Sequence, residues 1–170
     1  MPEQPNASET LTEEAHEAMS ELPPADITRS TVLIVDDHEQ NLELLQAYLE
    51  ELGCKTIGAR DGFDAIEMVE RHSPDLVLLD VMMPRMSGFQ VCEKIKSDPT
   101  TRDIPVVMVT ALNEVADVER AVESGANDFL SKPVHKIELI TRVRSLLQLR
   151  LLKQQQDELI GRIRKLTDSE

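Results

Sequence analysis

Aromatic residues are almost missing from this 170-residue chain, which has no tryptophan, one tyrosine and three phenylalanines. Its core must therefore be built from aliphatic side chains, and a hydrophobic content of 41% is enough to bury one. Cysteine is also scarce, and Cys54 and Cys92 lack metal-ligand spacing. We expect both to be small hydrophobic side chains in a reducing compartment. Solvated surface positions are expected for the four histidines, which are His16, His38, His72 and His135.

Basic residues are also under-represented relative to acidic ones. The chain has 18 lysine and arginine residues against 32 aspartate and glutamate residues, which gives a net charge of −14. Non-specific binding to nucleic acid or to anionic membranes needs a basic surface, so the composition argues against both. No run of about 18 apolar residues occurs, and no basic residues precede an apolar stretch near the start. We therefore expect a cytoplasmic protein without a signal peptide or membrane insertion.

Residues 1–30 differ in composition from the rest of the chain. They contain seven acidic residues against only Arg29, with few large apolar side chains. Four prolines also fall in this segment, at positions 2, 5, 23 and 24. Such a segment buries too little apolar surface to offset the entropy of ordering it, so we predict a disordered acidic tail over 1–30.

Five short runs rich in valine, isoleucine and leucine follow. They lie at 31–35, about 55–59, about 75–79, 105–109 and about 127–130. The runs lack apolar/polar alternation, which is typical of strands buried on both faces. Helices are predicted between and after them, at about 39–52, between Asp61 and Pro74, at about 88–97 and 115–124, and from about His135 onward. Alternating strands and helices predict an α/β fold with a parallel sheet.

Residues able to handle metal or phosphate stand at the ends of these runs. Asp36 and Asp37 follow the first strand, and Asp80 follows the third. In an open parallel sheet, ligands bind outside the carboxyl ends of the strands, where the strand order reverses. If the first and third strands are neighbours, the three carboxylates converge and repel one another. A divalent cation would remove this conflict, and oxygen ligands of this kind suit Mg²⁺.

Two further residues complete a set that could transfer a phosphoryl group. Thr110 follows the fourth strand, and Lys132 lies just past the fifth. A lysine ammonium and a threonine hydroxyl can each donate to phosphoryl oxygens, which leaves Asp80 as the natural nucleophile. Taken singly, each residue has an ordinary explanation, because acids after strands often cap helices and threonine or Lys-Pro often occurs in turns. Together at one edge of one sheet, they favour a shared chemistry.

The stretch 31–147 resembles the receiver domain of two-component response regulators. VLIVDD at 32–37 resembles the first strand of that family with its acidic pair, and LVLLDVMMPRMSGFQVC at 76–92 resembles the phosphoacceptor strand, loop and helix. VVMVTAL at 106–112 resembles the strand with the switch hydroxyl, and DFLSKP at 128–133 resembles the strand with the lysine. The methionine-rich loop and the run 97–105 look most like the N-terminal receivers of diguanylate cyclase response regulators.

The resemblance implies a flavodoxin-like receiver, which is a doubly wound five-stranded parallel sheet in the order 2-1-3-4-5. It also implies that Asp80 is the phosphoacceptor and that Mg²⁺ is held by Asp37 directly, by Asp36 through water, and by Asp80 and the Met82 carbonyl. Thr110 and Lys132 would contact the phosphoryl group, and Phe129 would be the aromatic switch. The Lys132–Pro133 bond would be cis. Met82 and Leu112 would flank the phosphoryl group without positioning water, which predicts slow dephosphorylation.

Three classes of function stay open. The first is a stand-alone receiver that takes a phosphoryl group from a sensor histidine kinase or a histidine phosphotransfer protein and switches its surface for a downstream protein partner. No GGDEF-type signature, helix-turn-helix or basic recognition helix follows. The second is a dimeric scaffold or adaptor that keeps the receiver only as a fold. Loss of Asp37, Asp80 or Lys132 from the sequence would favour this second class. The third is an aspartate-nucleophile phosphatase, which generally has a second acid where this chain has Met82.

The C-terminal segment 148–170 predicts an extended helix beyond the receiver. Six residues follow the 3-4-3-4-3 spacing of a coiled-coil seam, of which Gln156 is the one polar member: Leu149, Leu152, Gln156, Leu159, Ile163 and Leu166. No proline interrupts 136–170, and the seam spans fewer than three heptads. A weak homodimer is one expectation, and a frayed helix packed on its own domain is the other.

Overall fold

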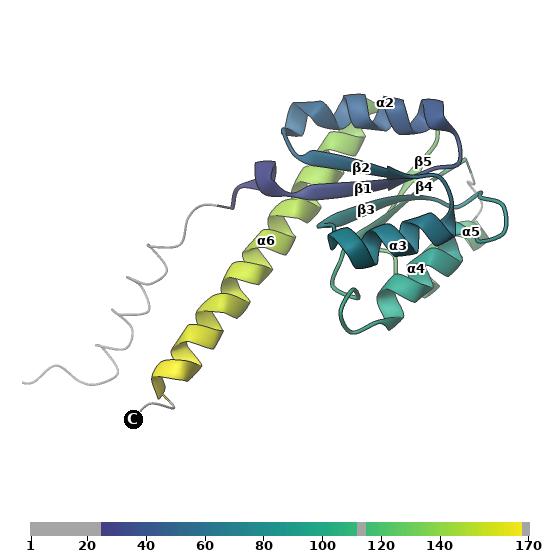
Figure 1. Cartoon of the computed structure of the whole chain (residues 1–170). Coiled ribbons are helices and arrows are strands. Elements are labelled where there is room, and N and C mark those ends of the chain that lie inside the picture. Colours follow the sequence, from purple (N-terminus) through teal and green to yellow (C-terminus); the bar gives the residue numbers. More distant parts are fainter. Residues whose placement is uncertain (1–24, 112–114, 168–170) are drawn as a thin grey trace, which may run out of the picture. The chain divides into compact units, whose positions relative to one another are not determined.

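A computed structural model describes residues 25–111 and 115–167 of the chain. Residues 27–150 form one compact unit. Residues 151–167 belong to a second unit and are described by themselves. The elements of the first unit, drawn in Figure 1, are η1 (Ile27–Arg29), β1 (Thr31–Val35), α2 (Glu39–Leu49), η2 (Glu50–Leu52), β2 (Lys55–Ala59), α3 (Gly62–His72), β3 (Leu76–Asp80), α4 (Gly88–Ser97), β4 (Val106–Thr110), α5 (Val115–Glu123), β5 (Asp128–Ser131) and the start of α6 (Lys136–Thr167).

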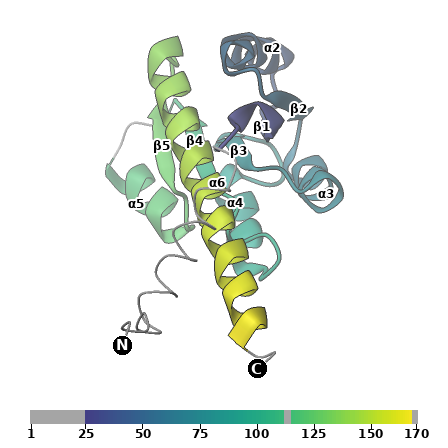
Figure 2. The same cartoon turned by 90° about the vertical axis from the view of Figure 1, so that its left-hand side faces the viewer.

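The strands form one parallel sheet in the order β2-β1-β3-β4-β5, which confirms the predicted doubly wound topology. Helices α2 and α6 cover one face of this sheet with a cluster of leucines, isoleucines and valines. Helices α3, α4 and α5 cover the other face. Figure 2 shows the first turns of α6 alongside β4 and β5. Every residue of β3 and β4 is buried, as the uninterrupted apolar runs predict.

Local sequence signals fix the ends of several helices. Asp61 caps α3 by accepting a hydrogen bond from the Asp64 backbone N–H at 2.8 Å. Ser87 and Gln90 form the predicted capping box of α4. Gly53 closes the η2 turn with φ at +69°, a conformation that glycine adopts without steric cost. These caps set where each helix begins or ends relative to the strand beside it.

Some predicted boundaries differ from the structure. β3 includes Asp80 and β4 includes Thr110, so these residues end their strands instead of following them. The last turn of the predicted helix over 39–52 is the 3-10 helix η2. The predicted tail over 1–30 lies mostly outside the described residues. Residues 27–29 form η1, and Ser30 is buried, so ordered structure begins before the predicted start at Thr31.

The predicted C-terminal helix is present as α6, which runs without interruption from Lys136 to Thr167. Its last predicted residues, 168–170, lie outside the described part of the chain. In its first half, four apolar side chains pack into the core: Leu139, Ile140, Val143 and Leu147. Among the described helices, none combines the length and the apolar character needed to cross a membrane.

Candidate functional site

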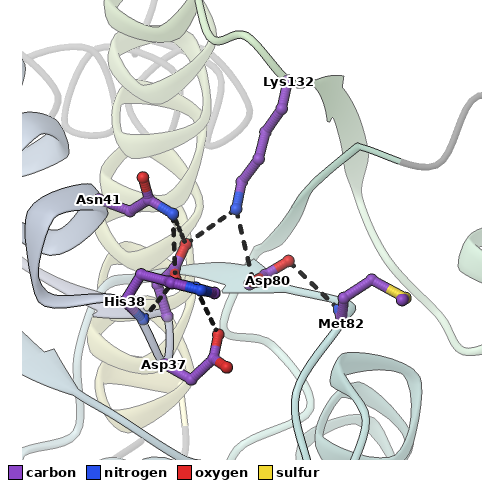
Figure 3. Close-up of polar contacts among 7 residues, drawn as sticks. Asp37, His38, Asn41, Asp80, Met82 and Lys132 are labelled. Carbon is purple, nitrogen blue, oxygen red and sulfur yellow. Dashed lines mark hydrogen bonds and ion pairs between the residues drawn. The ribbon is translucent and has the colours of Figure 1, made fainter.

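Four side chains that could bind a metal gather at the carboxyl ends of β1 and β3. These two strands are parallel neighbours, with Val35 opposite Leu79, so Asp36 just after β1 and Asp80 at the end of β3 come together. The residues are Asp36, Asp37, His38 and Asp80, and one ligand atom from each lies within 4.8 Å of the others. Figure 3 labels Asp37, His38 and Asp80 of this group and shows them close together. The predicted convergence of three carboxylates is therefore present.

Lys132 reaches this cluster from the loop after β5. Its Nζ lies 3.0 Å from Oδ2 of Asp36 and 3.4 Å from Oδ2 of Asp80 (Figure 3). Burial disfavours the ammonium, but the hydrogen bond with Asp36 and the charge of Asp80 outweigh it and raise the pKa of Lys132. A lysine that stays charged between two carboxylates can also neutralise the anionic oxygens of a ligand that binds beside Asp80.

Asp80 lies in a less favourable environment for its charge. Burial raises the pKa of its carboxyl, with the nearby charge of Asp36 adding to this effect and Lys132 opposing it. Its Oδ1 accepts a hydrogen bond from the Met82 backbone N–H at 3.2 Å. An open cleft leads to this carboxyl, and its lining includes Met82, Ala111 and Lys132. A carboxylate that is destabilised, yet accessible, gains from any cation or electrophile that binds there.

Asp36 is held more tightly than its neighbours. It is 1% exposed and accepts a hydrogen bond from the His38 backbone N–H at 2.9 Å. Nδ2 of Asn41 lies 3.1 Å from its Oδ2 and 3.3 Å from its Oδ1. Asn41 was not predicted as a site residue, although it lies on the first turn of α2, close behind the acidic pair in sequence. This amide fixes the orientation of the Asp36 carboxylate.

Asp37 is the least satisfied of the three acids. Within the described residues, its buried Oδ1 has no hydrogen-bond donor of suitable geometry. Nδ1 of His38 lies 3.0 Å from this oxygen and 3.4 Å from Oδ1 of Asp36. His38 is largely exposed, as predicted, but its contact with both acids was not predicted. A buried carboxylate oxygen without a donor is a suitable ligand for a cation.

This donor set fits Mg²⁺. It consists of carboxylate oxygens on a partly open cleft, which leaves room for the waters and phosphate oxygens that usually complete the shell of this ion. The exposed imidazole of His38 is not needed for such a site, because Mg²⁺ prefers oxygen ligands. Asp37, with its unsatisfied oxygen, and Asp80 are the acids that gain most from the ion.

The remaining candidates occupy β4 and β5. Thr110 is fully buried at the end of β4, and its neighbour Val109 pairs with Asp80 of β3. The Lys132 backbone N–H donates to the Thr110 carbonyl at 2.8 Å, so these two residues are adjacent at the sheet edge. Phe129 is half-buried on β5, opposite Met108. Leu112 lies outside the described residues. The Lys132–Pro133 peptide is cis, as the resemblance implied.

Comparison with known proteins identifies this arrangement. Residues 32–144 match the family model of the response regulator receiver domain. The chain belongs to that family. It is 50% identical over 121 residues to the response regulator PleD of Caulobacter vibrioides, covering 71% of this chain and 27% of PleD. It therefore spans about a quarter of that relative.

Two further relatives support the assignment. The polar-differentiation response regulator DivK of Brucella anthropi is 37% identical over 117 residues, which cover 69% of this chain and 95% of DivK. The solved signal receiver domain of a signal transduction histidine kinase from Syntrophus aciditrophicus has a TM-score of 0.66 and 39% identity, covering 69% of this chain and 89% of that one. Receiver domains bind Mg²⁺ at an acidic pocket and interact with histidine kinases or phosphotransfer proteins, and this chain has such a pocket.

Proposed function

We propose that this receiver accepts a phosphoryl group on Asp80 from a phosphohistidine of a sensor kinase or a phosphotransfer protein. The observation that carries this proposal is the position of Lys132 Nζ between Asp36 and Asp80, at the mouth of an open cleft. An Asp80 carboxylate oxygen attacks the phosphorus, the P–N bond to the donor imidazole breaks, and an aspartyl phosphate forms. The protein catalyses only its own phosphorylation and dephosphorylation.

Different groups around Asp80 would stabilise different charges on the phosphoryl group. Bound Mg²⁺ would neutralise charge on the transferring phosphoryl oxygens, and Asp37, Asp80 and the Met82 carbonyl would hold it, with Asp36 acting through water. Lys132 would leave its contact with Asp80 to pair with a phosphoryl oxygen while remaining close to Asp36. Thr110 would donate to a second phosphoryl oxygen. Phe129 would change rotamer as Thr110 moves, which alters the surface offered to a downstream protein.

The proposal is tested by intact-mass measurement after incubation with acetyl phosphate and Mg²⁺. We expect one added phosphate that is labile in base, and none in Asp80→Asn or after EDTA treatment. Asp98→Asn is the matched control, because Asp98 is an exposed carboxylate at the C-terminal end of α4 and does not line the cleft, so its loss should leave labelling intact. Equal labelling of wild type and Asp80→Asn would overturn the assignment of the phosphoacceptor.

A second function, as a dimeric scaffold, is favoured by the exposed seam of α6. The seam is the set Leu149, Leu152, Gln156, Leu159, Ile163 and Leu166. Leu149, Leu152, Ile163 and Leu166 are exposed by 62%, 55%, 43% and 72%, whereas Leu159 is half-buried. Apolar side chains at heptad spacing are typical of a helix that pairs with another. We propose a weak homodimer that phosphorylation strengthens through Thr110 and Phe129.

Sedimentation of the full chain tests this second function. We expect a dimer that tightens with beryllofluoride, a phosphoryl mimic, and weakens in the double variant Leu152→Ser, Leu159→Ser. A monomer in both states at high concentration would remove the scaffold function, while leaving the phosphorylation of Asp80 to be judged by mass.

We also propose a cytoplasmic setting and a protein target. Cys54 and Cys92 are free thiols, which fits a reducing compartment. The net charge of −14 disfavours direct binding to nucleic acid. Capture experiments with phosphorylated and unphosphorylated protein, run side by side, would test for a partner that distinguishes the two states.

A further inference from the structure

The seam of α6 contains one polar residue among five apolar ones. In the heptad that places Leu149 at position a, Gln156 also occupies an a position, and it is exposed. Its neighbours along the seam, Leu152 and Leu159, occupy d positions. A helix that packed this face against an ordinary apolar surface would bury the Gln156 amide without a partner, which is unfavourable because the amide loses its hydrogen bonds to water.

Charged side chains next to the seam do not oppose a second copy of the same helix. The flanking e positions hold Lys153, Ile160 and Thr167, and the g positions hold Gln148, Gln155 and Arg162. In a parallel pair, each g residue faces the e residue five positions later on the other helix. Lys153 then faces Gln148, and Arg162 faces Thr167. No like charges meet at these pairs, and the two acids between residues 148 and 167, Asp157 and Glu158, lie at positions b and c, away from the seam.

The direction and register of the two helices determine which residue of the second copy lies opposite the Gln156 amide. In a parallel pair in register, Gln156 lies opposite Gln156 of the second copy, where each amide can donate to and accept from the other. In an antiparallel pair, a positions face d positions, so Gln156 would face a leucine in every register. In a parallel pair shifted by one heptad, it would face Leu149 or Ile163. Of these arrangements, only the parallel pair in register lets the two Gln156 amides hydrogen-bond to each other.

We infer that the seam binds a second copy of this chain as a parallel, in-register helix pair whose register is selected by Gln156. This inference rests on the proposed self-association and adds its geometry. A polar a position is known to fix register and oligomeric state at a cost in stability. The pairing is accordingly weak, which suits a contact that a switch elsewhere in the chain strengthens or releases.

The test uses disulfide trapping in the full-length chain, with Cys54→Ser and Cys92→Ala as the background. Ile163→Cys at an a position should form a homodimeric disulfide under mild oxidation. A mixture of Ile163→Cys and Leu152→Cys proteins, whose positions face each other only in an antiparallel pair, should give no mixed disulfide above the level set by random collision. Thermal unfolding of each variant checks that the fold is retained.

Gln156→Leu provides the second readout. It should tighten association severalfold while the antiparallel mixed disulfide appears, because the restraint on register is gone. Gln154→Leu on the outer face is the matched control and should leave the disulfide pattern unchanged. A dimer that gives the mixed disulfide in the background with Gln156 intact would overturn the parallel register but leave the proposed self-association standing. A monomer at all concentrations would overturn both, and the Asp80 labelling would remain a separate result.

Discussion

Gly88 lies directly against the backbone carbonyl of Asp80. A Cβ at position 88 would overlap the Asp80 oxygen and would lie 2.9 Å from both the Asp80 carbonyl carbon and the Cα of Val81. These are backbone atoms, which cannot rotate away as a side chain can. The first turn of α4 therefore rests on the peptide that follows the proposed phosphoacceptor, and the Gly88 N–H donates to the Val81 carbonyl at 3.0 Å.

Gly88→Ala should consequently destabilise the fold and disturb the Asp80 site. We expect a loss of about 1–3 kcal/mol in the free energy of unfolding, the usual cost of overpacking a rigid site. Phosphorylation by acetyl phosphate should slow, because the loop that carries Met82 must shift. Urea denaturation and intact-mass kinetics measure the two effects.

The matched control is Gly161→Ala on α6, where a Cβ would meet nothing within 4 Å. Replacing a glycine inside a helix by alanine should stabilise it by up to about 1 kcal/mol. If the two substitutions changed stability in the same direction, the close approach of Gly88 to Asp80 would not be the reason for glycine at that position.

Asp80→Asn should stabilise the protein when divalent cations are absent. Burial raises the pKa of Asp80 in the folded state above its ordinary value of 3.8, so folding disfavours the ionised carboxyl. Below pH 3.8, Asp80 is protonated in both the folded and the unfolded wild type, and folding carries no penalty from it. As pH rises through and above the raised pKa, the folded protein must hold an ionised carboxyl that burial disfavours, and the wild type loses stability. The advantage of the asparagine variant should therefore be largest near neutral pH and shrink toward pH 4.

Thermal melts in EDTA between these pH values measure this advantage, which we expect to be a few degrees. Added Mg²⁺ should raise the melting temperature of the wild type more than that of Asp80→Asn, because binding to the folded state stabilises it by mass action. Asp98→Asn is the control of opposite sign, since hydrogen bonds from Thr100 lower the pKa of Asp98. A lower melting temperature for Asp80→Asn in EDTA at pH 7 would contradict the argument.

Met82 should set a long lifetime for the phosphorylated protein. Met82 is 60% exposed and lines the cleft to Asp80, where its side chain offers no carboxylate or amide to position an attacking water. Met82→Asn introduces such a group and should speed hydrolysis of the aspartyl phosphate severalfold. Loss of the added phosphate mass with time measures the rate, with Met82→Leu as the apolar control. An unchanged rate in Met82→Asn would refute this explanation.

The resemblance to receiver domains supplied the strand order, which the structure confirms. Once the first and third strands are neighbours, the convergence of Asp36, Asp37, Asp80 and Lys132 follows, because parallel strands bring their carboxyl ends to one edge of the sheet. Contacts that no repeating pattern encodes were not predicted. The Asn41 amide on Asp36 depends on the exact rotation of α2 over the sheet. Apolar periodicity reports which face of a helix is buried, but it does not report where a polar group on its edge points.

Arg150 is a second contact of this kind, and it supports a final prediction. Its Nε lies 3.4 Å from Asp75 Oδ1, and its Nη1 donates to the Asp103 carbonyl at 2.8 Å. Asp75 Oδ2 in turn accepts from the Thr31 backbone N–H at 2.8 Å. One arginine of α6 thus joins the starts of β1 and β3 and the loop before β4, although it lies 75 residues from Asp75 in sequence.

Arg150→Met keeps most of the apolar stem and removes every donor. Because Arg150 and Asp75 are both largely buried, at 17% and 23% exposed, the variant leaves the Asp75 carboxylate without its cationic partner and should lose about 1–3 kcal/mol of stability. Arg71→Met is the matched control, since Arg71 pairs with Glu67 on the exposed surface of α3 and should lose under about 0.5 kcal/mol. Urea denaturation compares the two. Equal losses would mean that Arg150 contributes no more to stability than a surface ion pair does.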